Sequence, residues 1–116
     1  MIIKNEQKIA ETREHMRGGD GTVVLNAILK GDALPKNCRL FSEIVLQPGC
    51  SIGDHPHENE CELFYVLEGT AVYNDNGTVV TAGPGEALCC DHGQTHAIRN
   101  AGDCTLKLLA VIITRV

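Results

Sequence analysis

The chain has few of the residues that mark several large protein classes. It has no Trp, and its two Tyr and two Phe make up only 3% of 116 residues, so a core must consist mainly of aliphatic side chains. A transmembrane helix needs roughly 18 or more consecutive apolar residues, whereas the longest apolar run, LLAVII, covers only residues 108–113. The N-terminal residues lack the apolar stretch of a signal peptide. We therefore expect no membrane span and a cytoplasmic location.

Positive charge and paired cysteines are also scarce. Lys and Arg number 10 against 15 Asp and Glu, for a net charge of −5. Nucleic-acid binding needs clustered positive charge, so we expect no nucleic-acid partner. The six cysteines form no Cys-x-x-Cys pair, and without a secretory signal a disulfide framework is not expected. We interpret each cysteine as a small buried apolar residue. A redox role is the alternative for Cys61, which lies next to Glu62, and for Cys50, which lies near the histidines.

What the sequence does contain, from Thr22 onward, is a series of short strand-like runs. TVVLNAILK, RLFSEIVL and CTLKLLAVIIT are rich in Val, Ile, Leu and Thr and are separated by turn residues. The Asn-Gly pair at residues 76–77 predicts a type I′ hairpin turn. Together the runs predict eight to ten antiparallel strands in one all-β sandwich or barrel. We assign the barrel to residues 21–116. Residues 1–20 form an extension, with a helical turn from Asn5 and a flexible end at RGGDG, that packs on the barrel or on a second copy.

The stretch HPHENECE, residues 55–62, concentrates potential metal ligands. Alternate residues of a strand share a face, so His55 and His57 point to the same side. A turn through residues 58–60 would place Glu62 opposite them, and we interpret the two acids of that turn as solvated. A carboxylate on an apolar face needs a partner, and a divalent cation is an adequate one. On residue types alone, ligand chemistry and an ordinary polar strand explain this pattern equally well.

His96 is a fourth candidate ligand. Strand alternation places Arg99 on the opposite face from His96. The residues that share the ligands' faces, Phe64, Val66 and Ile98, are predicted to form a narrow apolar pocket wall. Two other histidines are less suitable as ligands, because His15 lies in the N-terminal extension and His92 in a turn.

The spacing of these residues matches two motifs. The first is Gly, five residues, His-x-His, three or four residues, Glu, six residues and Gly, and it is present as Gly49, His55, His57, Glu62 and Gly69. The second is Gly, five residues, Pro-x-Gly, two residues, His, three residues and Asn. It is present as Gly85, Gly93, His96 and Asn100, with Asp91 at the usual turn proline.

With these motifs the chain resembles the cupins, in particular small single-domain members similar to oxalate decarboxylases. The resemblance implies a double-stranded β-helix, or jelly-roll barrel, of antiparallel strands. It also implies that His55, His57, Glu62 and His96 bind one divalent metal ion. Three imidazoles and one carboxylate suit Mn²⁺, Fe²⁺, Ni²⁺ or Zn²⁺ without selecting sharply among them.

The function implied by the resemblance is binding of, or action on, a small carboxylate or keto acid, as in a decarboxylase or dioxygenase. A non-catalytic binding module is one alternative. A sugar-phosphate isomerase is another, but it would need several basic residues around the pocket, and the strand regions offer few: Lys30, Arg39, Arg99 and Lys107. Proton transfer would require an inward-facing acid or base, for which Glu43, Tyr73 and Arg39 are candidates. Because both faces of ELFYVL and LKLLAVII are largely apolar, we expect a homodimer.

Overall fold

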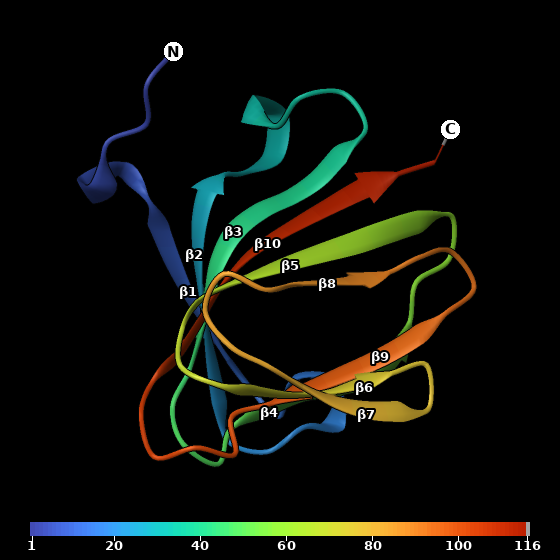
Figure 1. Ribbon diagram of the computed structural model, residues 1–116. Helices are drawn as coiled ribbons and strands as arrows, with labels where there is room; N and C mark the ends of the chain where they lie inside the picture. The colour runs from blue at the N-terminus through green and yellow to red at the C-terminus, as the bar shows by residue number, and fades with distance from the viewer. Residues whose placement is uncertain (116) are drawn as a thin grey trace.

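Residues 1–115, which the computed structural model describes, form ten strands and three short 3-10 helices (Figure 1). The 3-10 helices are η1 (Asn5–Gln7), η2 (Met16–Gly18) and η3 (Gly31–Ala33). The strands are β1 (Ile9–Glu14), β2 (Thr22–Leu29), β3 (Cys38–Leu46), β4 (Ser51–Pro56), β5 (Glu60–Glu68), β6 (Ala71–Asp75), β7 (Thr78–Ala82), β8 (Ala87–Cys90), β9 (Thr95–Arg99) and β10 (Leu106–Thr114). Within this part of the chain, no helix is long and apolar enough to cross a membrane.

The strands form two antiparallel sheets that face each other (Figure 1). One sheet has the order β1-β2-β3-β10-β5-β8, and the other has the order β4-β9-β6-β7. From β3 to β6 and again from β7 to β10, each successive strand lies in the opposite sheet. This repeated crossing is the jelly-roll arrangement, and the predicted all-β fold is confirmed.

The core lies between the two sheets and follows the alternation of the strands. In β10 every second residue from Leu106 to Ile112 is buried, as expected for a strand with one face on the core. Asn100 is also completely buried, and its side-chain amide donates to the carbonyl oxygens of Leu46 at 2.8 Å and Cys104 at 2.7 Å. A buried amide without partners would be costly, so these bonds explain why an Asn suits the end of the second motif.

Two turns show how the glycines shape the chain. Asn76 and Gly77 form the two-residue loop between β6 and β7, with φ of 49° and 99°. The predicted type I′ hairpin needs positive φ at both positions, and this requirement is met. Gly69 directly follows β5 and has a φ of 83°, and a Cβ there would lie 2.3 Å from the Thr105 carbonyl oxygen. No larger residue fits that position.

The N-terminal extension is part of the larger sheet. β1 pairs with β2 from Ile9 opposite Ala27 to Glu14 opposite Thr22. The segment that follows β1 is expected from the sequence to be flexible. In the structure it is held to β4 by hydrogen bonds. Ser51 N–H donates to the Asp20 carbonyl at 2.9 Å, and Asp20 N–H donates to Ser51 Oγ at 2.8 Å. The boundary between residues 20 and 21 stays a prediction, as does any contact of the extension with a second copy.

The interpretation of all six cysteines as buried was wrong. All six are free, but only Cys90 is buried, and the others are half-buried or exposed. Cys89 and Cys90 show the reason, since neighbouring residues of β8 point to opposite faces of the sheet. Cys89 therefore lies on the outer face of the sheet. The apolar character of a cysteine does not by itself determine on which face of a strand its side chain lies.

Candidate metal centre

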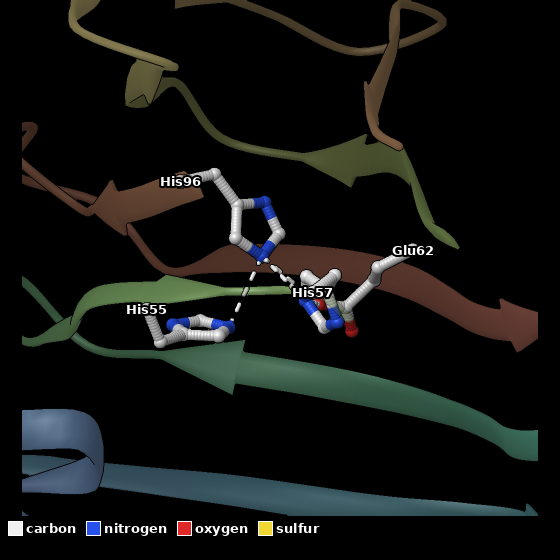
Figure 2. Close-up of side chains that lie close together, drawn as sticks. All are labelled: His55, His57, Glu62 and His96. Carbon is white, nitrogen blue, oxygen red and sulfur yellow. Dashed lines mark hydrogen bonds and ion pairs between the residues drawn. The ribbon is translucent and has the colours of Figure 1, made fainter. Parts of the chain in front are cut away.

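The structure brings the four predicted ligands together in one buried cluster (Figure 2). One potential ligand atom from each of His55, His57, Glu62 and His96 lies within 4.8 Å of the others. The Nε2 atom of His96 is 3.0 Å from that of His57 and 3.1 Å from that of His55. Glu62 Oε1 lies 3.0 Å from His57 Nε2 and 3.1 Å from His96 Nε2. Three imidazoles and a carboxylate thus surround one small volume.

Both sheets contribute to this cluster. His55 on β4 lies directly opposite His96 on β9, in the four-stranded sheet. The turn after β4 then carries the chain into β5 of the six-stranded sheet, which places Glu62 across from the histidines. The parities expected from the sequence agree with the burial: Glu62 and His96 are buried, and Arg99 is exposed.

The turn before His96 holds without the usual proline. The Asp91 carboxylate accepts the His92 N–H at 2.7 Å, and this bond, with a further one from Arg115, lowers the pKa of Asp91. The same turn bonds to the first motif, because Gly93 N–H donates to the His57 carbonyl at 2.8 Å and His57 N–H donates to the Gln94 carbonyl at 3.1 Å. Asp91 therefore stabilises the turn through side-chain hydrogen bonds, whereas a proline at this position would stabilise it by restricting the backbone.

The second nitrogen of each imidazole has its own partner. His55 Nδ1 lies 2.8 Å from the Gly53 carbonyl oxygen, and His57 Nδ1 bonds to a carboxylate oxygen of Glu60. A neutral imidazole whose Nδ1 donates to an oxygen keeps a lone pair on Nε2, so His55 and His57 in this tautomer present Nε2 as a cation ligand. These lone pairs and the Glu62 carboxylate point at one another. Such a set of acceptors fits a cation between them.

His96 is held by two aromatic residues. Its Nδ1 atom lies 2.7 Å from the hydroxyl of Tyr73, which is 1% exposed. Phe64 stacks on the His96 ring, with centroids 5.3 Å apart and planes 13° apart. Burial raises the pKa of Tyr73 far above its ordinary value, so the hydroxyl stays protonated and serves as a hydrogen-bonding partner of the imidazole.

Glu60 corrects one interpretation made from the sequence. The sequence predicts a solvated turn acid, but the Glu60 side chain is only 13% exposed, whereas that of Glu58 is 66% exposed. Besides His57, it bonds to Arg39 through two contacts of 2.8 Å. These bonds from Arg39 outweigh burial and lower the pKa of Glu60. Glu60 therefore carries negative charge next to His57 and fixes the orientation of its ring.

The electrostatics of the cluster differ from residue to residue. Burial lowers the pKa of His55, whereas the hydrogen bond with Glu62 raises the pKa of His57. Burial acts to raise the pKa of Glu62, but the bonds with His57 and His96 outweigh it and hold the pKa below its usual value. The cluster thus keeps an ionised carboxylate inside the barrel.

A cavity of about 110 Å³ opens beside the cluster and is lined in part by His55, His57 and Glu62. Its apolar wall consists of Met16, Leu25, Leu40, Ile44, Ile52 and Ile112. The predicted wall residues are placed differently: Phe64, Val66 and Ile98 lie in the core and are not among the lining residues. Their contact with a ligand stays a prediction.

Three arginines also line the cavity: Arg13, Arg17 and Arg39. The first two come from the N-terminal extension, and sequence reasoning missed them because nothing local indicates that this segment reaches the cavity. Of the other charged candidates, Glu43 binds Lys8 at 3.0 Å and Arg99 binds Asp20 at 2.7 Å. Neither Glu43 nor Arg99 lines the cavity.

With this geometry established, comparison with known proteins identifies the family. The family model for the cupin domain, Cupin_2, matches residues 42–112, and the chain belongs to this family. An oxalate-binding protein of Thermotoga maritima is 39% identical over 113 residues, which cover 97% of this chain and 93% of that protein. The tetracenomycin polyketide synthase protein TcmJ of Streptomyces glaucescens is 30% identical over 95 residues, or 82% of this chain and 61% of that protein.

Solved structures agree with this assignment. The crystal structure of a predicted oxalate decarboxylase from Thermotoga maritima has a TM-score of 0.93 and 38% identity, covering 98% of this chain and 99% of that one. KdgF from a Halomonas species has a TM-score of 0.79, covering 100% of this chain and 94% of that one. Its identity is only 15%, so this second likeness concerns the fold alone.

Proposed function

We propose that this cupin binds one divalent metal ion through His55, His57, Glu62 and His96 and uses the adjoining cavity to bind a small carboxylate. The observation that carries the proposal is the convergence of the three Nε2 atoms and Glu62 Oε1 within hydrogen-bonding distances, with Nδ1 of each ring engaged elsewhere. Mn²⁺, Fe²⁺, Ni²⁺ and Zn²⁺ all accept this mixed set of donors. When bound, such an ion would supply a Lewis acid that attracts an anionic oxygen ligand.

A small carboxylate is favoured by the size and charge of the cavity. A volume of about 110 Å³ is small compared with the roughly 300–1,000 Å³ of sites for drug-sized ligands, which favours a small ligand over a sugar phosphate. The cavity is also bordered by arginines, which match carboxylates geometrically. The relative described as an oxalate-binding protein supports the same class of ligand.

Binding without turnover is the function that we favour over a decarboxylase or dioxygenase. General acid–base catalysis needs a positioned group with a suitable pKa. Among residues 1–115, the cavity lining contains no carboxyl group other than the proposed ligand Glu62. Tyr73 is bonded to His96, and Arg39 is bonded to Glu60. Measured turnover of oxalate or a keto acid by the metal-loaded protein would contradict this preference.

The metal assignment is tested by elemental analysis of purified variants. Wild type is expected to contain about one divalent ion per chain, and His55→Ala and His96→Ala are expected to lose it. His92→Ala is the matched control, because this exposed histidine lies outside the cluster. Unchanged metal content in His55→Ala and His96→Ala would refute the assignment.

The ligand class is tested by thermal unfolding of the metal-loaded protein with oxalate, other small carboxylates and sugars. A ligand at 100 times its Kd stabilises a protein by about 2.7 kcal/mol, so binding is readily detected. Carboxylates should stabilise wild type and Glu58→Gln but not Glu62→Gln. Stabilisation by sugars or phosphates alone would favour the isomerase alternative.

We also propose that the outer face of the six-stranded sheet binds a second copy of the chain. Three apolar side chains on this face are exposed: Leu63 (39%), Tyr65 (46%) and Ile113 (42%). In the strand register, Val111 on β10 lies between Leu63 on β5 and Phe41 on β3. These apolar residues make a continuous strip across β5, β10 and β3, as an isologous dimer interface requires.

Sedimentation at micromolar concentration should show a dimer for wild type and a 12.5 kDa monomer for Leu63→Glu. Val79→Glu, at an exposed apolar site in the other sheet, should remain dimeric. A wild-type monomer would refute the proposed interface. A cytoplasmic location remains a prediction from the sequence.

A further inference from the structure

The segment between β1 and β2 holds Met16 and Arg17 at the cavity. His15 N–H donates to the Gly21 carbonyl at 2.9 Å, which closes the segment into a loop. Both His15 and Arg17 adopt left-handed backbone conformations, with φ of 51° and 55°. Residues other than glycine rarely adopt this conformation, and where they do the surrounding structure must enforce it.

The loop is fixed against β4 by close backbone packing. A Cβ on Gly19 would lie 2.2 Å from the Ser51 carbonyl oxygen, and one on Gly53 would lie 2.2 Å from the Arg17 carbonyl oxygen. Only glycines permit this approach. The Asp20 carboxylate also bonds to Arg99 on β9 at 2.7 Å. The loop that carries Arg17 is therefore attached to β4 and β9, the two strands that carry His55 and His96.

The three arginines that line the cavity differ in what they bind. Arg39 is occupied by Glu60 through two bonds of 2.8 Å. Arg13 contacts both carboxylate oxygens of Glu11 at 3.4 Å. For Arg17, no hydrogen bond or ion pair of the guanidinium occurs among residues 1–115. Arg17 is exposed at the edge of the cavity. Its guanidinium is therefore free to hydrogen-bond to an anion that enters the cavity, and the planar group suits a carboxylate through two parallel hydrogen bonds.

We propose that Arg17 binds the outer carboxylate of a ligand whose other end approaches the His–Glu cluster, and that it selects short dicarboxylates over monocarboxylates. This inference rests on the proposed function. A cavity of about 110 Å³ is smaller than the roughly 300–1,000 Å³ of sites for drug-sized ligands, so it favours dicarboxylates with a short link between the two carboxylates. A dianion gains a charged hydrogen bond to Arg17 that a monoanion of the same size lacks.

Titration calorimetry of the metal-loaded protein with oxalate and glycolate tests the inference. Glycolate resembles oxalate in size but has a neutral hydroxymethyl group in place of the second carboxylate. A charge-assisted hydrogen bond corresponds to roughly a 10- to 100-fold change in affinity. Arg17→Gln should therefore weaken oxalate binding at least 10-fold and change glycolate binding less than about 3-fold. Arg17→Gly should show the same loss, since glycine accepts the left-handed backbone and preserves the loop.

Two controls separate this role from a general effect. Lys4→Gln removes one exposed positive charge from the start of the chain and should bind both anions as wild type does. Metal content should be unchanged in both Arg17 variants. Equal weakening of oxalate and glycolate in Arg17→Gln would overturn the selectivity. Unchanged oxalate binding in Arg17→Gln would overturn the inference but leave the proposed function intact, whereas a wild type that binds no oxalate would overturn both.

Discussion

Replacing Tyr73 by Phe removes one hydroxyl group from the interior and nothing else. That hydroxyl lies 2.7 Å from His96 Nδ1 in a region where both side chains are 1% exposed. Water cannot replace the lost partner at such a site without rearrangement, and an unsatisfied buried polar group costs about 1–3 kcal/mol. The free energy of unfolding of the metal-free protein should therefore fall by about 2 kcal/mol. With a urea slope of about 2 kcal/mol per molar, the midpoint should fall by about 1 M.

The same substitution should weaken metal binding, because the ring of His96 loses the bond that orients it. Loss of an outer-shell partner typically costs about 10- to 100-fold in metal affinity. The chain offers a matched control in Tyr65→Phe, since the only other tyrosine is 46% exposed on the outer face of β5. Urea unfolding and competition with a metal-binding dye measure the two effects. If Tyr73→Phe matched Tyr65→Phe in both assays, the positioning role assigned to Tyr73 would be refuted.

Three further predictions concern regions around the site. Gly53→Ala should destabilise the fold strongly, because its Cβ would lie 2.2 Å from a backbone oxygen, whereas Gly102→Ala, with 3.5 Å to a side-chain oxygen, should unfold near wild type in urea. Burial raises the pKa of Cys90 to about 11, so a thiol reagent at pH 8 should modify exposed Cys104 much faster; equal rates, resolved by mass spectrometry, would contradict this. Hydrogen bonding from its arginine partner lowers the pKa of Asp20 from 3.8, so the stabilisation by this carboxylate is present above that value and is lost as the pH falls through the folded-state pKa. Asp20→Asn should therefore be less stable than wild type at pH 7, with the difference narrowing below about pH 4; a difference independent of pH would count against the ion pair.

The residues that could be predicted from the sequence are those with a strong local pattern. Period-two alternation is a property of a single strand, so it placed Glu62 and His96 on inward faces before any pairing was known. The Asn-Gly turn is likewise local, because positive φ is set by two adjacent residues. The motif spacing then linked His55 and His57 to the other two candidates. None of these inferences required knowledge of which strands are neighbours.

The contacts that the sequence does not predict depend on strand neighbours. Tyr73 reaches His96 because β6 pairs with β9, with Tyr73 opposite Ile98, and no pattern within either strand encodes that pairing. Glu60 begins β5 beside an acid-rich turn, and its partner Arg39 is 21 residues away in the sequence. Arg17 lies in a segment that lacks hydrophobic periodicity, and the sequence therefore predicts that this segment is flexible. Its position is set by backbone packing against Gly53, and this packing cannot be predicted from the sequence alone.

The outer partners of the histidines explain why the whole barrel is needed for the site. Gly53 comes from β4, Glu60 from the start of β5 and Tyr73 from β6, so both sheets must be in register before all three rings are oriented. In an unfolded chain these partners are separated, and the imidazoles would rotate freely and exchange tautomers. Any cation that binds the oriented cluster more tightly than the unfolded chain must therefore stabilise the fold by mass action. Folding and the capacity to bind an ion are thus two consequences of the same set of hydrogen bonds.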